Sequence, residues 1–169
     1  QFLCACLTDF ERLYGVDGVA ITTHGASAAL VTRDALALPV LDYEFTLPQS
    51  AVVAYNALRP AFSETLSPRL PVGLNLGAQL HYLLTTFPTE FSRTEHILTY
   101  PQYWCFRLTG QARSEVTSLG CHTDLWQPEK GDFSSLVGRM LPVNLFPVLA
   151  QAGDVFALSP TAAQATGLR

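Results

Sequence analysis

The stretch that decides the fold runs from Tyr100 to Trp126 and reads YPQYWCFRLTGQARSEVTSLGCHTDLW. Pro101 suits the first turn of a helix, and Gly110 suits its end because glycine readily adopts the left-handed conformation that closes a helix. The stretch therefore predicts a helix over 101–108. The polar residues after it, rich in serine and threonine, predict an extended segment over 114–118.

The residues on either side predict a mixture of strands and helices. Aliphatic and β-branched runs predict three strands, joined by turns at 24–27 and 33–34, over 16–21, 28–32 and 36–41. Apolar spacing and capping residues predict helices over 2–13, 51–58, 75–87, 133–140 and 160–166. We expect the first helix to pack on the sheet. Without an internal repeat, the prediction is one α/β domain over residues 1–169.

Charge and hydropathy exclude two classes of partner. The net charge is −4 and lysine and arginine form no cluster, so the basic surface that nucleic-acid binding needs is missing. No apolar run approaches the roughly 18–20 residues that span a bilayer, and the first residues lack the pattern of a signal peptide. The sequence therefore predicts no nucleic-acid partner, no membrane partner and a cytoplasmic location.

Neither a metal site nor a hydrolase site is predicted. The four cysteines, at 4, 6, 105 and 121, lie mostly in apolar segments and are interpreted as reduced core thiols. His122-Thr123-Asp124 resembles part of a histidine–aspartate pair, but the histidines lack the i, i+4 spacing of a helical metal site. Ser27 lies in no Gly-x-Ser-x-Gly motif.

The order of these segments resembles the N-terminal domain of the FGGY carbohydrate kinases. In that family a helix ending in Leu-Thr-Gly, here residues 108–110, precedes a Thr/Ser-Asp/Glu-x-Thr/Ser segment, here SEVTS at 114–118. Further matching segments are VAITTHGASAALV at 19–31, LPVLDYE at 38–44 and LPVGLNLGAQLHYLL at 70–84. The resemblance covers nearly the whole chain.

The resemblance implies a fold and an activity. The fold is the ribonuclease H-like α/β fold shared by actin, hsp70 and sugar kinases, with a mixed sheet and flanking helices, present here incompletely. The activity is ATP-dependent phosphorylation of a ketose, a related sugar or a polyol, with this chain forming the sugar-side wall.

Two family motifs do not occur in the sequence. The Asp-x-Gly-Thr/Ser motif, which organises the ATP phosphates and Mg²⁺, is absent, and so is the Gly-Gly-x-x-Asp segment that carries the catalytic aspartate. The resemblance therefore implies a fragment whose catalytic aspartate lies beyond Arg169. ATP and Mg²⁺ are expected to bind with a C-terminal domain of the same parent chain. Alone, the chain is expected to show no kinase activity.

Seven residues are candidates for sugar binding: His24, Gly25, Asp42, Glu44, Asn75, Gln79 and Gln102. The resemblance places the turn with His24 on the sugar; from the residues alone, a turn histidine bonded to local backbone is favoured about two to one. The family has an Asn-Asp or Gln-Asp pair before Thr-Arg where this chain has Asp-Tyr-Glu and no following arginine, so solvated loop acids are nearly as well supported. The three amides also suit the capping of exposed backbone groups at helix ends.

A second hypothesis is a non-catalytic sugar-binding or scaffold module. Such a module needs no flanking phosphate motif and should bind a sugar alone, whereas a kinase parent needs both missing motifs. The residues leave open which sugar and which hydroxyl would be phosphorylated, and they are compatible with a homodimer.

Overall fold

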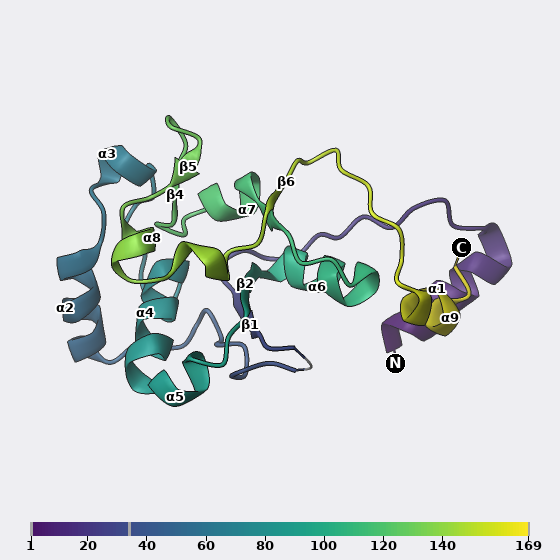
Figure 1. The fold of residues 1–169 in the computed structure, drawn as a ribbon, viewed down its shortest axis with the longest axis horizontal. Helices are drawn as coiled ribbons and strands as arrows, with labels where there is room; N and C mark the ends of the chain where they lie inside the picture. The colour runs from purple at the N-terminus through teal and green to yellow at the C-terminus, as the bar shows by residue number, and fades with distance from the viewer. Residues whose placement is uncertain (1, 34, 169) are drawn as a thin grey trace.

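The computed structural model describes residues 2–33 and 35–168, and its main body is built around a short antiparallel sheet (Figure 1). Strand β1 (Ala28–Val31) pairs with β2 (His96–Thr99), so that Ala29 faces Leu98. All four residues of β1 are buried. Two further pairs are separate: β3 (Ser114–Glu115) is parallel to β6 (Leu149–Ala150), and β4 (Trp126–Gln127) is antiparallel to β5 (Asp132–Phe133).

Helices surround these strand pairs. Their bounds are α1 Phe2–Tyr14, α2 Gln49–Leu58, α3 Phe62–Thr65, α4 Leu76–Thr86, α5 Pro88–Phe91, α6 Tyr100–Thr109, α7 Val116–Gly120, α8 Leu136–Arg139 and α9 Pro160–Thr166, with a 3₁₀ helix η1 at Val143–Leu145. Helix α4 forms the centre of the core, where Leu76 and Leu80 pack in one cluster with Ile97, Leu125 and Leu136. No helix in the described part of the chain is long and apolar enough to cross a bilayer.

Helix predictions that rested on capping residues are confirmed. Helix α6 ends at Gly110, whose φ of 74° is the left-handed conformation expected there. Helix α9 begins at Ser159, whose hydroxyl accepts a hydrogen bond from the Ala162 amide at 3.2 Å. The helices predicted over 51–58 and 75–87 are present as α2 and α4.

Two of the three predicted strands are wrong. Residues 16–21 belong to no strand, because their backbone finds no neighbouring strand among residues 2–33 and 35–168. Of residues 36–41, only Leu36 forms a bridge, with Val31. The partner of β1 is instead β2, which lies far along the chain, and sequence pattern does not identify such a distant partner. Residues 24–27 are therefore not the turn of a hairpin, contrary to the prediction. The turn predicted at 33–34 lies partly outside the described residues.

Local hydrogen bonds and backbone conformation overturn two further predictions. The extended segment predicted over 114–118 ends after Glu115, because the Glu115 carboxylate accepts from the amides of Thr117 and Ser118 at 2.9 and 3.0 Å and so begins helix α7. The helix predicted over 133–140 shrinks to the single turn α8, in which Gly138 has a φ of 92° that an α-helix does not accommodate.

The first helix packs on α9 and not on the sheet, contrary to the prediction. Figure 1 shows α1 and α9 together at one end of the molecule, joined to the main body by two long extended segments. No residue of α1 is buried, and its apolar side chains include Phe2 and Tyr14, which are 85% and 77% exposed. The periodicity of this helix was therefore a correct guide to helix formation but not to its partner.

Buried His81 on α4 makes stability sensitive to acid. Burial lowers the pKa of His81 below its ordinary value of 6.5, and its Nδ1 has no hydrogen-bond partner in the described part of the chain. The folded state therefore binds this proton less readily than the unfolded state. The contribution of neutral His81 to the stability of the folded state is therefore complete above about pH 6.5, and it is lost as the pH drops below that value.

Urea unfolding at about pH 7.5 and about pH 5.5 tests this expectation. The free energy of unfolding should fall by up to about 1.4 kcal/mol for each pH unit below the unfolded pKa. His81→Phe should flatten the dependence, while His122→Asn, which removes an exposed histidine, should not change it. If the free energy of unfolding of His81→Phe fell with pH as steeply as that of the unsubstituted protein, His81 would not be the source of the acid sensitivity.

Candidate functional site

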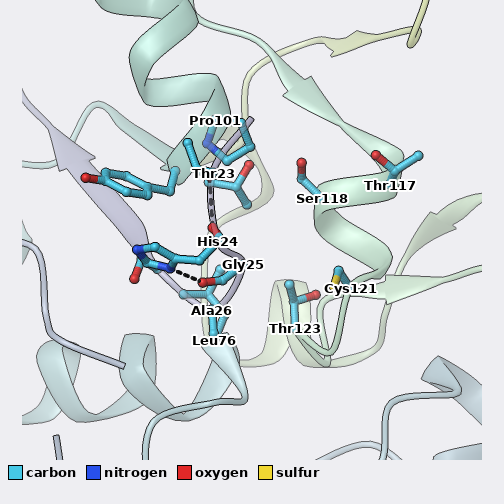
Figure 2. Close-up of a pocket in the computed structure, with 13 residues that line it drawn as sticks. Thr23, His24, Gly25, Ala26, Leu76, Pro101, Thr117, Ser118, Cys121 and Thr123 are labelled. Carbon is cyan, nitrogen blue, oxygen red and sulfur yellow. Dashed lines mark hydrogen bonds between the residues drawn. The ribbon is translucent and has the colours of Figure 1, made fainter. Parts of the chain in front are cut away.

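A cavity of about 200 Å³ lies where the turn before β1 meets the starts of α6 and α7 (Figure 2). The turn contributes residues 23–27, and α6 contributes Tyr100 and Pro101. Opposite the turn lie Thr117 and Ser118 of α7 and the loop after it, with Cys121 and Thr123. The structure thus joins the two segments on which the sequence interpretation most depended.

His24 is fixed by its neighbours. Its Nδ1 lies 2.7 Å from the carbonyl oxygen of Gly25, and since a carbonyl only accepts, Nδ1 must carry the proton. In the neutral ring, Nε2 is then a free acceptor. The ring lies between Tyr43 and Tyr100, with ring centroids 4.9 and 5.0 Å away. The turn thus presents an oriented imidazole that can accept a hydrogen bond from a hydroxyl group.

Gln79 holds the turn after His24 in place through two hydrogen bonds. The Gln79 side-chain amide donates to the carbonyl oxygens of Ala26 and Gly73, at 2.6 and 2.5 Å. Ala26 has a left-handed φ of 55°, a conformation that is uncommon for residues with a side chain. Gly25 is exposed, and a Cβ atom there would lie 3.7 Å from the sulfur of Cys121. A side chain at Gly25 would thus narrow the cavity.

Helix α7 supplies hydroxyl groups to the opposite wall. Partial burial of Glu115 opposes its ionisation, but hydrogen bonds from Thr117 and Ser118 outweigh it and lower the pKa of the Glu115 carboxyl. The charged carboxylate in turn fixes the first turn of α7. Cys121 is exposed at this wall, so interpreting it as a core thiol is wrong; the four cysteines are free.

The three predicted amides do not line this cavity. Asn75 donates to the carbonyl oxygens of Pro68 and His122, both at 3.1 Å, and accepts from the Leu70 amide at 2.8 Å. Gln102 accepts from the Thr99 hydroxyl. Asn75 and Gln79 thus bond backbone groups of neighbouring loops, whereas Gln102 bonds a side chain, and no side chain caps the start of α4 or α6. Direct contact of these amides with a sugar stays a prediction.

The two predicted carboxylates lie on the loop after residue 41, outside the cavity lining. Asp42 and Glu44 are both exposed, and the Asp42 carboxylate accepts from the Glu44 amide at 2.9 Å. The residue between them, Tyr43, is the one that contacts His24. Their role in sugar binding stays a prediction, and Tyr43 is a site residue that the sequence interpretation missed.

Asp124, another residue with a missed role, fixes the loop after α7. Its side chain is fully buried, accepts from the Tyr55 hydroxyl at 2.7 Å and binds Arg59 through two contacts of 2.9 Å. Burial and the nearby Asp124 raise the pKa of Tyr55, and the hydrogen bond to Asp124 raises that of Arg59. His122 and Asp124 both have left-handed φ values, 57° and 64°. The aspartate of His122-Thr123-Asp124 is therefore structural, in agreement with the spacing that argues against a metal or catalytic cluster there.

Residues 2–33 and 35–168 contain no group of three or more His, Cys, Asp or Glu side chains placed to hold a metal ion.

No protein-family model matches the chain. No curated protein sequence matches it either. Among solved structures, a carbohydrate kinase from Novosphingobium aromaticivorans matches 99% of this chain at 41% sequence identity and a TM-score of 0.92. The structural neighbours of this chain are carbohydrate kinases of the FGGY type.

Kinases with much lower sequence identity share the fold of this chain. A xylulose kinase from Lactobacillus acidophilus matches 99% of the chain at 16% identity and a TM-score of 0.80. A gluconate kinase from the same organism matches 99% at 15% identity and a TM-score of 0.73. The predicted fold class, the ribonuclease H-like fold of actin, hsp70 and sugar kinases, is confirmed. The chain spans about a third of the length of these structures, from 35% to 36%.

Proposed function

We propose that the protein containing these residues is an ATP-dependent kinase of a ketose, a related sugar or a polyol. Residues 1–169 would form its sugar-binding wall, within an N-terminal domain. The observation that carries the proposal is the cavity at His24, which the turn VAITTHGAS and the hydroxyl-bearing start of α7 form together. The 41% identity to a carbohydrate kinase over nearly the whole chain supports it.

The cavity suits a neutral polyhydroxylated ligand. None of the 13 residues that line it is Asp, Glu, Lys or Arg. His24 offers an acceptor. The Thr117 hydroxyl donates to the Glu115 carboxylate and keeps its acceptor lone pairs, and Ser118 offers a further hydroxyl. A sugar acid, such as the gluconate named for one matched structure, would require a cation that this lining does not provide. The substrate is therefore proposed to be uncharged where it meets this wall.

The remaining predicted residues are assigned by their position. Asn75 and Gln79 are proposed to act through the backbone that they hold, since both side chains are buried and hydrogen-bonded. Asp42, Glu44 and Gln102 are proposed as contacts to parts of the sugar that extend beyond the cavity.

ATP and Mg²⁺ are proposed to bind outside residues 1–169. ATP supplies the phosphoryl group and Mg²⁺ neutralises its charge in kinases of this kind. The described residues offer no cluster that fits a metal ion. The part of the reaction proposed for this chain is to bind and orient the sugar, in a cytoplasmic enzyme.

His24→Ala tests the proposal. Removing the oriented acceptor should weaken sugar binding about tenfold, the effect of one lost hydrogen bond of roughly 1.4 kcal/mol. Calorimetric titration with xylulose, fuculose and rhamnulose measures this effect, and ATP-dependent phosphorylation of the same sugars by the whole protein measures the activity.

The control is Thr22→Ala, which removes a hydroxyl next to the turn but outside the cavity lining. It should leave the affinity unchanged. Equal affinities for the His24 variant and the unsubstituted protein would exclude the site. Binding that depends on His24 without phosphorylation would instead identify a sugar-binding module.

A further inference from the structure

A second cavity, of about 240 Å³, lies between helix α2, the loop before α4 and the first turns of α4. It shares no lining residue with the cavity at His24. Residues 46–59 form one side and residues 69–78 the other. The proposed sugar site therefore does not account for it.

The polar side chains at this cavity have unused hydrogen-bonding groups. Arg69 is exposed, and its guanidinium makes no hydrogen bond and has no carboxylate within 4 Å among residues 2–33 and 35–168. Gln49 and Asn56 are exposed as well, and their side-chain amides make no hydrogen bond to other residues in that part of the chain. These three exposed side chains line one cavity, and each has N–H groups that can donate to a ligand bound there.

A second guanidinium, that of Arg59, also lines the cavity and is only 14% exposed. Its Nε and one terminal nitrogen bind Asp124 and the carbonyl oxygen of Ser67. The other terminal nitrogen, Nη1, has no partner among the described residues. The lining contains no Asp or Glu. Asp124 balances the charge of Arg59, so the charge of Arg69 remains uncompensated.

The cavity wall also contains a strained residue. Val72 has a φ of 48°, which is a genuine outlier for a β-branched side chain. Backbone strain of this kind costs on the order of 1–3 kcal/mol and concentrates at ligand-binding segments. The strain lies in the same short loop as Arg69 and is independent of its charge.

We propose that this cavity is a second binding site, for a small anion whose oxygen atoms accept from guanidinium and amide groups. Arg69 supplies the positive charge, and Asn56 and Gln49 supply further donors. A guanidinium binds a planar or tetrahedral oxyanion through two parallel hydrogen bonds, which gives the site its preference for such ligands. The proposal does not depend on which sugar occupies the cavity at His24.

Calorimetric titration of the protein with inorganic phosphate tests the site, at an ionic strength held constant so that screening does not change. Saturable binding is expected, and Arg69→Gln should weaken it at least about tenfold, the factor that about 1.4 kcal/mol represents. Because Arg69 is exposed and unbonded, the variant should keep the melting temperature of the unsubstituted protein.

The matched control is Lys130→Gln, which removes the same unit of charge from the exposed turn between β4 and β5. It should leave the phosphate affinity within about twofold, since Lys130 does not line the cavity and exposed charges are screened by salt. Three results would overturn the proposal: no saturable binding, binding that survives Arg69→Gln, or equal weakening by both substitutions.

Discussion

Asp124→Ala is expected to lower the free energy of unfolding by about 3–5 kcal/mol, the range measured when one partner of a buried ion pair is removed. The carboxylate is fully buried, and its loss would leave the Arg59 guanidinium and the Tyr55 hydroxyl without their acceptor. Alanine would also have to adopt the left-handed φ of 64° found at this position. Both effects act in the same direction.

Urea unfolding of two further variants separates these effects. Asp124→Asn keeps an oxygen acceptor and tolerates the left-handed backbone, so its loss should be smaller than that of alanine. Asp17→Ala removes an exposed carboxylate that makes no hydrogen bond in the described part of the chain, and should change stability by less than about 0.5 kcal/mol. If Asp124→Ala were as stable as Asp17→Ala, the buried network would not support the fold.

Gly77→Ala is expected to cost about 3 kcal/mol, the upper part of the range for overpacking. A Cβ atom at this position in α4 would overlap the Tyr55 hydroxyl oxygen and lie 2.9 Å from the carbonyl oxygen of Thr123. That carbonyl also accepts from the Gly77 amide at 2.9 Å, so the two segments cannot separate without losing the hydrogen bond. Thermal and urea unfolding measure the effect.

The matched control is Gly18→Ala. An added Cβ atom there meets no atom within 4 Å, and the residue does not have a positive φ. This substitution should be neutral or slightly stabilising, because alanine restricts the unfolded chain. If the Gly77 variant had the same melting temperature and urea midpoint as the Gly18 variant, α4 and the loop at Thr123 would be less closely packed than these distances indicate.

The sequence predicted elements well where the signal was local. Ser159 with Pro160 and Gly110 after Thr109 marked helix ends that depend on neighbouring residues only. Strand pairing depends on distant residues, and β1 finds its partner in β2 after several intervening helices. The apolar run at 16–21 therefore suggested a strand that the fold does not form.

In the candidate site, too, the segments with a local sequence signal were predicted and the contacts between distant residues were not. The resemblance directed attention to His24 and to residues 114–118, and the structure brings both segments to one cavity. Tyr43 and Asp124 were not recognised, because ring contacts and a buried ion pair join residues that are far apart in sequence. The amides showed why composition alone is ambiguous, since the same side chain can bind a ligand or a backbone carbonyl.

The pairing of α1 with α9 carries an entropic consequence for the order of folding. These two helices are the first and the last of the described chain, so nearly every other residue lies in the loop that their contact closes. Closing a long loop directly is costly, and the cost falls when intervening contacts have already shortened it. The sheet of β1 and β2 and the packing around α4 provide that shortening. We therefore expect α1 to dock on α9 late in folding, after the core around α4 has formed.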